Sequence, residues 1–145
     1  MSELTLERAQ KIVTDSIAHG RAKSLQKLAV AVLDERGALK SFAAEDGTSL
    51  KRAEIAIGKA SAALAFGIGT RSINKMAKDR PYFIDCTANA VGGPFIPVPG
   101  GVLIKSGAGV LLGAVGISGD ISDNDEAAAV AGIQAAGFVA DGGKD

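Results

Sequence analysis

Residues 92–137 constrain the fold of this chain more than any other segment. They contain two apolar runs, 101–105 and 110–118, which are joined by the small residues of 106–109. A short glycine-rich link between two apolar runs is typical of a β-hairpin. An alanine-rich segment follows and ends at Gly137, as helices commonly do. The pattern predicts antiparallel strands and a closing helix, and therefore an α+β fold with a hollow large enough for a ligand.

The first half of the chain predicts a second hairpin that lies between two helices. Apolar runs at 28–33 and 38–44 are separated by residues 34–37, whose Asp-Glu-Arg-Gly sequence favours a type I turn. Helical periodicity precedes this hairpin over residues 6–20 and follows it over residues 49–66. The expected order is therefore helix, hairpin and helix.

A third, short helix is expected from Thr70 to the residue before Pro81, because proline interrupts a helix. Between Tyr82 and Pro99 the sequence predicts an irregular segment or an edge strand. Two glycines and three prolines fall there, and proline is tolerated in a sheet only at its edge.

Three cations of this short helix, Arg71, Lys75 and Lys78, are spaced so that they share one face. One interpretation is a solvated face of the helix. The other is a binding surface for an anionic group such as a carboxylate.

Composition excludes several classes of function. The 145 residues fit one domain, 1–145, and carry 16 basic and 16 acidic side chains. Nucleic-acid binding needs a basic surface with stacking aromatics, so we expect no nucleic-acid partner. One cysteine and one histidine exclude an internal disulfide and a multi-histidine metal site. The polar first residues are not followed by an apolar core of signal-peptide length, and no apolar run is long enough to span a bilayer. We therefore expect a cytoplasmic protein without a membrane partner.

The glycine-rich segments do not match nucleotide or hydrolase motifs. Gly107 and Gly109 begin a G-x-G pattern, but Leu112 stands where the dinucleotide fingerprint needs its third glycine. The segment also lies in a hairpin, whereas that fingerprint works in a strand-to-helix turn. Asp120 likewise replaces the second glycine of a nucleophile elbow that would begin at Gly116.

Together these segments resemble the GlcG/HbpS-like family, which also includes the C-terminal domain of PduO-type proteins. The matching positions follow one another through nearly the whole chain: Val30-Ala31-Val32-Leu33-Asp34, Gly37, Ile57, Lys59-Ala60, Ala63, Thr70, Gly92-Gly93-Pro94, Gly113-Ala114-Val115-Gly116-Ile117-Ser118-Gly119, Asp125-Glu126 and Ala131-Gly132. The long glycine-containing segment with the Asp-Glu pair is the most specific part.

The resemblance implies a profilin-like sandwich, in which helices flank a five-stranded antiparallel sheet, often in a homo-oligomer. Some members of the family bind haem, and some lie among genes for small-molecule catabolism, of glycolate or propanediol. Others have no settled activity. One departure concerns the residues before the Asp-Gly that follows the second strand. Many members have Arg-Met there, whereas this chain has Ala44-Glu45, which exchanges a cation for an anion.

The first functional hypothesis is a small-ligand-binding protein that binds haem. Iron needs a side-chain donor, and the imidazole of His19, at the edge of the apolar face of the first helix, is the available one. Backbone at Gly92, Gly93 and Gly119 would allow a ligand to approach closely. The alternative for His19 is an ordinary surface histidine.

The second hypothesis is a small-molecule enzyme, such as a hydratase, lyase or isomerase, acting on a carboxylate-bearing metabolite. Its candidate acid–base groups are Lys59, Asp125, Glu126 and Glu45. The alternatives are a lysine at the edge of the core and acidic residues that favour a helix N-terminus. A third hypothesis is a structural or regulatory partner protein that oligomerises through its alanine-rich helices.

Overall fold

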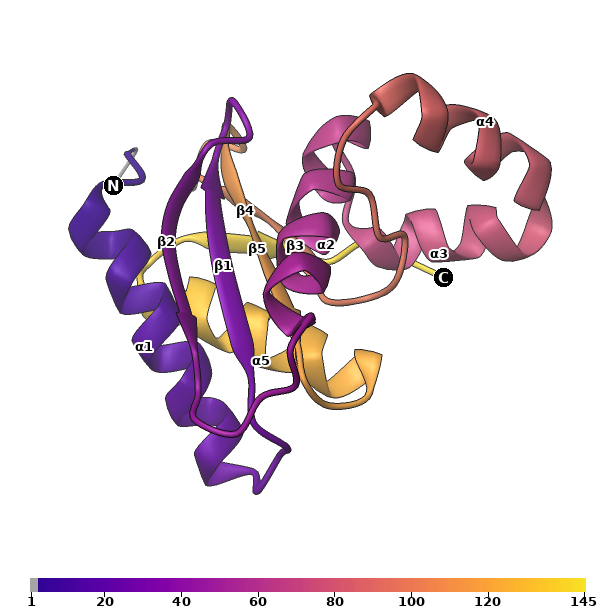
Figure 1. Cartoon of the computed structure of the whole chain (residues 1–145). Coiled ribbons are helices and arrows are strands. Elements are labelled where there is room, and N and C mark those ends of the chain that lie inside the picture. The colour runs from indigo at the N-terminus through magenta and orange to yellow at the C-terminus, as the bar shows by residue number, and fades with distance from the viewer. Residues whose placement is uncertain (1–2) are drawn as a thin grey trace.

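Five antiparallel strands run through the centre of the computed structural model, which describes residues 3–145 (Figure 1). The strands are Ala29–Asp34 (β1), Leu39–Ala44 (β2), Gly101–Lys105 (β3), Leu111–Ser118 (β4) and Val139–Asp141 (β5), in the spatial order β2-β1-β4-β3-β5. Every neighbouring pair is antiparallel. The predicted five-stranded antiparallel sheet flanked by helices is confirmed.

The two faces of the sheet differ in side-chain size. On β1, Val30 and Val32 belong to the core beneath one face, whereas Ala29 and Ala31 belong to a smaller cluster on the other. On β4, Gly116 lies against the backbone of a helix, where a Cβ would overlap the carbonyl oxygen of a facing alanine. A helix therefore packs closely on the alanine and glycine face, while the valine face holds a thicker core.

Helices cover both of these faces (Figure 1). The helices Leu6–Ala22 (α1) and Ser122–Ala135 (α5) pack on each other and on the valine face. The helix Arg52–Phe66 (α2) packs on the alanine and glycine face. The helices Thr70–Asp79 (α3) and Pro81–Val91 (α4) lie beyond α2 and share a separate apolar cluster with it. The C-terminal residues end beside α3.

The predicted irregular segment from Tyr82 to Pro99 is partly wrong, because its first half is the helix α4. Pro81 ends α3 and also occupies the first turn of α4, where its missing N–H costs nothing. Gly92 ends α4 with a φ of 74°, a conformation that favours glycine. The sequence pattern indicated only that Pro81 ends a helix, whereas in the structure the same residue also begins the next helix.

The predicted turn between the first two strands is confirmed. The Asp34 carboxylate accepts hydrogen bonds from the backbone N–H groups of Arg36, at 2.9 Å, and Ala38, at 3.1 Å. Gly37 has a φ of 85°, which only glycine adopts without strain. Within residues 3–145 no helix is both long and apolar enough to cross a membrane.

Candidate functional site

His19 lies beside a shallow hollow on the outer surface of α5. The hollow has a volume of about 440 Å³ and is lined by His19, Asp123, Glu126, Ala127, Val130, Ala131 and Gln134. The apolar members recur along α5 at the three- and four-residue spacing that places side chains on one helix face. Within residues 3–145 the imidazole of His19 makes no hydrogen bond or ion pair, so both ring nitrogens are available to a ligand.

A close crossing of two helices brings His19 to this surface. At Gly132 of α5 a Cβ would overlap the Ser16 hydroxyl and approach the Ile12 carbonyl oxygen, both on α1. Because glycine has no Cβ, the α5 backbone can rest directly on α1. His19 follows Ser16 by three residues and therefore lies next to the same helix.

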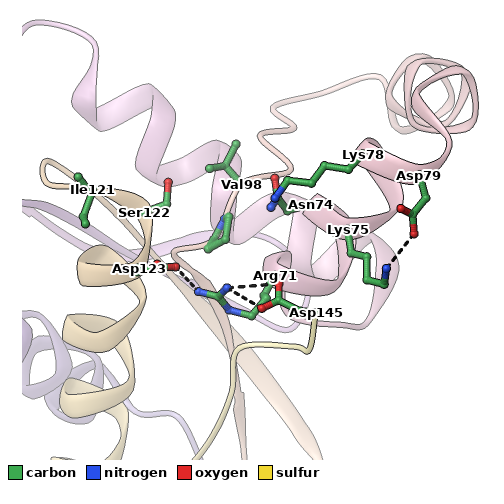
Figure 2. Close-up of a pocket in the computed structure, with 11 residues that line it drawn as sticks. Arg71, Asn74, Lys75, Lys78, Asp79, Val98, Ile121, Ser122, Asp123 and Asp145 are labelled. Carbon is green, nitrogen blue, oxygen red and sulfur yellow. Dashed lines mark hydrogen bonds and ion pairs between the residues drawn. The ribbon is translucent and has the colours of Figure 1, made fainter.

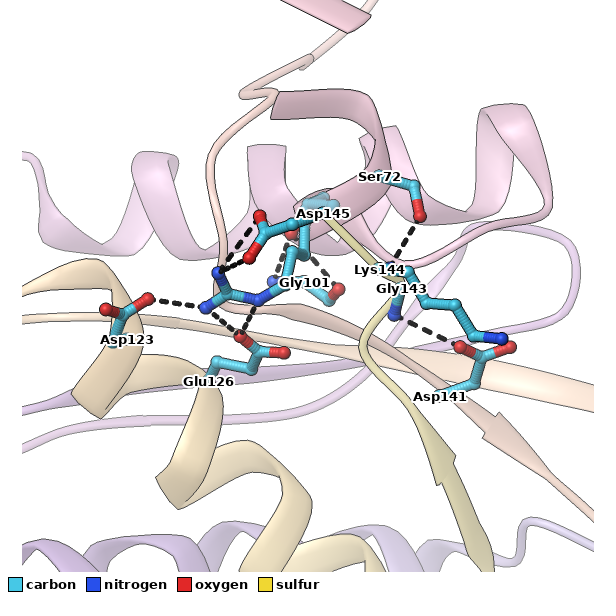
Figure 3. A network of polar contacts seen from close by, with 10 residues as sticks. Ser72, Gly101, Asp123, Glu126, Asp141, Gly143, Lys144 and Asp145 are labelled. Atoms are coloured by element: carbon cyan, nitrogen blue, oxygen red, sulfur yellow. Dashed lines mark hydrogen bonds and ion pairs between the residues drawn. The ribbon is translucent and has the colours of Figure 1, made fainter. Parts of the chain in front are cut away.

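Arg71, at the start of α3, holds three acidic side chains together. Its Nε atom donates to Glu126 Oε2 at 2.8 Å, and its Nη2 atom donates to both Glu126 and Asp123. Its Nη1 atom donates to the two carboxylate oxygens of Asp145 at 3.2 and 3.4 Å (Figure 3). The hydrogen bonds to Glu126 and Asp123 raise the pKa of Arg71 above its ordinary value. Arg71 therefore stays charged and joins α3 to α5.

A second hollow, of about 560 Å³, opens beside this cluster (Figure 2). Its lining includes Arg71, Lys75 and Lys78, the three cations that the sequence placed on one helix face. The prediction that these three cations share one helix face is therefore confirmed, and this face forms part of the wall of the hollow. Asp123 lines both hollows, so the Arg71 cluster lies between them.

Lys59 on α2 and Asp125 on α5 form a buried ion pair. The Lys59 Nζ atom lies 3.1 Å from Asp125 Oδ2 and donates to the Ile117 carbonyl oxygen at 2.9 Å. The other Asp125 oxygen accepts from the backbone N–H of Asp120 at 2.9 Å. Burial lowers the pKa of Lys59 and raises the pKa of Asp125, and the opposite charge of each partner counteracts the shift of the other.

Glu45 and the candidate glycines lie apart from the His19 hollow. The Glu45 carboxylate accepts from the Leu28 N–H at 2.9 Å and pairs with Arg21. A Cβ at Gly119 would overlap the Lys27 carbonyl oxygen. Neighbouring backbone therefore occupies the space beside this glycine, where a ligand was expected to approach. Gly92 and Gly93 are exposed at the end of α4 and line neither hollow.

The structure therefore groups the sequence candidates in three places. Lys59 pairs with Asp125 in the interior, and Glu126 pairs with Arg71 beside the His19 hollow. Glu45 lies apart from both groups, where it contacts Leu28 and Arg21. Their functional roles remain predictions. Asp145 and the apolar floor of the His19 hollow were not predicted from the sequence. The helical spacing of Ala127, Val130 and Ala131 could have indicated that floor. Within residues 3–145 no three His, Cys, Asp or Glu side chains gather as a metal site.

Comparison with known proteins decides the family. The sequence profile of the family described as haem degrading protein HbpS-like matches residues 4–134. The chain belongs to the HbpS-like family. This confirms the resemblance found in the sequence. Among curated proteins, none matches this HbpS-like chain in sequence.

Several solved structures share this HbpS-like fold. A complex of PduOC with haem is 20% identical, with a TM-score of 0.83 and coverage of 94% of this chain and 96% of the other. HbpS is 24% identical, with a TM-score of 0.79 and coverage of 93% and 91%. The Klebsiella pneumoniae protein ORFY is 20% identical, with a TM-score of 0.79 and coverage of 94% and 92%. At these identities the likeness supports the fold.

Proposed function

We propose that this chain binds haem, with the His19 imidazole as the iron ligand. The observation that carries the proposal is the unpartnered, half-buried imidazole beside a hollow with an apolar floor. A neutral imidazole is the most common protein ligand of haem iron. Two observations from relatives support haem binding in general: the family is described as haem degrading, and PduOC was solved with haem.

The residues of the hollow fit one face of a haem. Ala127 and Ala131 are small, so a flat ring can lie against α5 without meeting long side chains. Val130 adds an apolar contact, and Gln134 supplies a hydrogen-bond donor at the end remote from Asp123. The propionates of haem are anionic and would be repelled by Asp123 and Glu126, so they would extend toward Gln134 or into solvent.

When bound, haem would supply an iron able to take a further ligand and to exchange electrons. The tasks of this chain are to donate one nitrogen from His19 and to exclude water from one ring face through Ala127, Val130 and Ala131. The hollow is open to solvent, so this chain would cover only one face of a ring bound there. We therefore propose that a second copy of the chain covers the other face, as part of a homo-oligomer.

A haemin titration of the purified chain tests this proposal. We expect a saturable Soret shift in the parent chain and its loss in His19→Ala. Thr14→Ala, an exposed substitution on the same helix, serves as the matched control and should bind as the parent does. The proposal fails if His19→Ala gives the same spectrum and affinity as the parent.

A second variant tests the hollow without removing the imidazole. Ala127 is exposed, so Ala127→Phe can be introduced without disturbing the core, but its ring would fill the apolar floor. We expect weaker haem binding with His19 still present. Unchanged affinity in Ala127→Phe would show that haem, if bound, lies elsewhere.

A further inference from the structure

The hollow beside α3 contains cations that the proposed haem site does not use. Arg71 and Lys78 line it together with Asn74, all from one face of α3 (Figure 2). Lys75 also lines it, but this side chain is paired with Asp79 at 3.0 Å. Among residues 3–145 the Lys78 ammonium has no hydrogen-bond or ion-pair partner. The hollow is therefore lined by one uncommitted cation and a guanidinium, both on the same face of α3.

Arg71 binds its carboxylates in two different ways. Glu126 receives two donors of the guanidinium, and its side chain is only 16% exposed. Asp145 receives Nη1 alone, at 3.2 and 3.4 Å, and its side chain is 74% exposed. An exposed ion pair of this kind contributes little to the stability of a protein, because water and salt screen it. The Asp145 carboxylate can therefore leave Arg71 at little cost.

The backbone before Asp145 is held on α3 independently of that carboxylate. The Gly142 carbonyl oxygen accepts from the Arg71 N–H at 3.2 Å. The Lys144 N–H donates to Ser72 Oγ at 2.8 Å (Figure 3). Because Gly142 passes directly over Gly69, a side chain at position 69 would overlap it. This anchored segment keeps a carboxylate at the mouth of the hollow.

The start of α5 adds donors on the opposite side of the hollow. Ser122 and Asp123 line it, and within residues 3–145 their backbone N–H groups have no hydrogen-bond partner. Unpaired N–H groups in the first turn of a helix favour an anion. The carboxylates of Asp79 and Asp123 also line the hollow and would repel an anion. Each is paired with a cation, Asp79 with Lys75 and Asp123 with Arg71.

We propose that this hollow binds a small organic carboxylate, which replaces the Asp145 carboxylate on Nη1 of Arg71. The exchange leaves the charge around Arg71 unchanged, since one carboxylate replaces another. The incoming ligand gains the Lys78 ammonium and the free N–H groups of α5, which Asp145 does not contact. Asp145 thus acts as an internal competitor for the site. This proposal does not depend on haem binding.

Titration of the full chain, free of haem, with sodium acetate tests the proposal. The ¹⁵N-detected Arg71 Nε–H signal is followed at constant ionic strength, with sodium chloride as the reference anion. We expect a saturable shift with acetate. Asp145→Asn removes the competitor and should bind acetate more tightly, by about two- to fivefold, the range that corresponds to an exposed ion pair.

A pair of lysine variants locates the ligand. Lys78→Gln should weaken acetate binding by about two- to fivefold, because it removes one exposed charge contact. Lys23→Gln makes the same charge change at the end of α1, away from the hollow, and should leave the affinity unchanged. The proposal is overturned if chloride produces the same shift as acetate, or if Asp145→Asn and Lys78→Gln both bind acetate as the parent does.

Discussion

Two groups of charges attach other helices to α5, and they differ in their access to water. The side chains of Lys59 and Asp125 are 4% and 1% exposed, and they bond to each other, to the Ile117 carbonyl oxygen and to the Asp120 N–H. Asp123 and Asp145, which share Arg71, are 71% and 74% exposed. The buried pair has no room for a ligand, whereas the open cluster can exchange one carboxylate for another. Burial thus separates a structural ion pair from a candidate binding site.

The largest expected effect breaks the buried pair. Lys59→Ala leaves the Asp125 carboxylate buried without its partner, which should lower the free energy of unfolding by about 3 to 5 kcal/mol. Urea denaturation measures the change. Lys51→Ala removes a lysine from an exposed pair near the start of α2 and should cost about 0 to 1 kcal/mol.

The double variant Lys59→Met with Asp125→Asn removes both buried charges and keeps an acceptor for the Asp120 N–H. We expect it to recover much of the lost stability, because no unpaired charge remains. A Lys59→Ala chain as stable as Lys51→Ala would show that the pair is not structural.

A smaller effect, dependent on pH, is expected at Asp120, a half-buried carboxylate that precedes α5. Hydrogen bonds from the Gln26 N–H, the Asn124 amide and the Ile121 N–H lower the pKa of Asp120 below its ordinary value of 3.8. A lowered pKa in the folded state means that Asp120 stabilises the fold above pH 3.8 and loses this contribution as the pH falls further.

Asp120→Asn should therefore cost about 1 kcal/mol at neutral pH, a typical value for a hydrogen bond of this kind. The difference from the parent should shrink below pH 3.8. Chemical denaturation at several pH values measures it. A difference that stays constant from pH 7 to pH 2 would contradict the assigned pKa shift.

The smallest effect is expected in the open cluster. Asp123→Asn removes a carboxylate that is mostly exposed, so we expect a cost of about 0 to 1 kcal/mol at low salt. High salt should abolish this difference, because mobile ions screen exposed charges far better than buried ones. The cost of Lys59→Ala should persist at the same salt concentration. Equal salt sensitivity of the two variants would remove the distinction between the groups.

Much of the fold was predictable from local patterns. The hairpin at Gly37 follows from an Asp that accepts backbone hydrogen bonds and a Gly at positive φ. The hairpin of β3 and β4 follows from two apolar runs around a glycine-rich link. The helix α4 escaped prediction, because Pro81 suits both the end of one helix and the first turn of the next. The three residues of β5 are too few to give a strand pattern.

The candidate sites were predictable only in part. Helical spacing alone placed Arg71, Lys75 and Lys78 on one face, and the structure confirms it. Spacing could not show that Asp145, 74 residues from Arg71 in sequence, would contact that face. It also could not show that Lys59 would reach Asp125, because a long side chain on α2 has many possible partners before the sheet and α5 are assembled.

The sequence by itself determined the family, the antiparallel sheet with its flanking helices, and the single imidazole on α1. Each of these depends on residue identity and on spacing along a short segment, and such information is local. The tertiary structure decided which charges are buried and which remain open. That distinction depends on Gly116 and Gly132, where the absence of a Cβ lets α2 approach the sheet and α5 approach α1. Close packing of these helices buries Lys59 with Asp125 and leaves His19 and Arg71 beside open hollows.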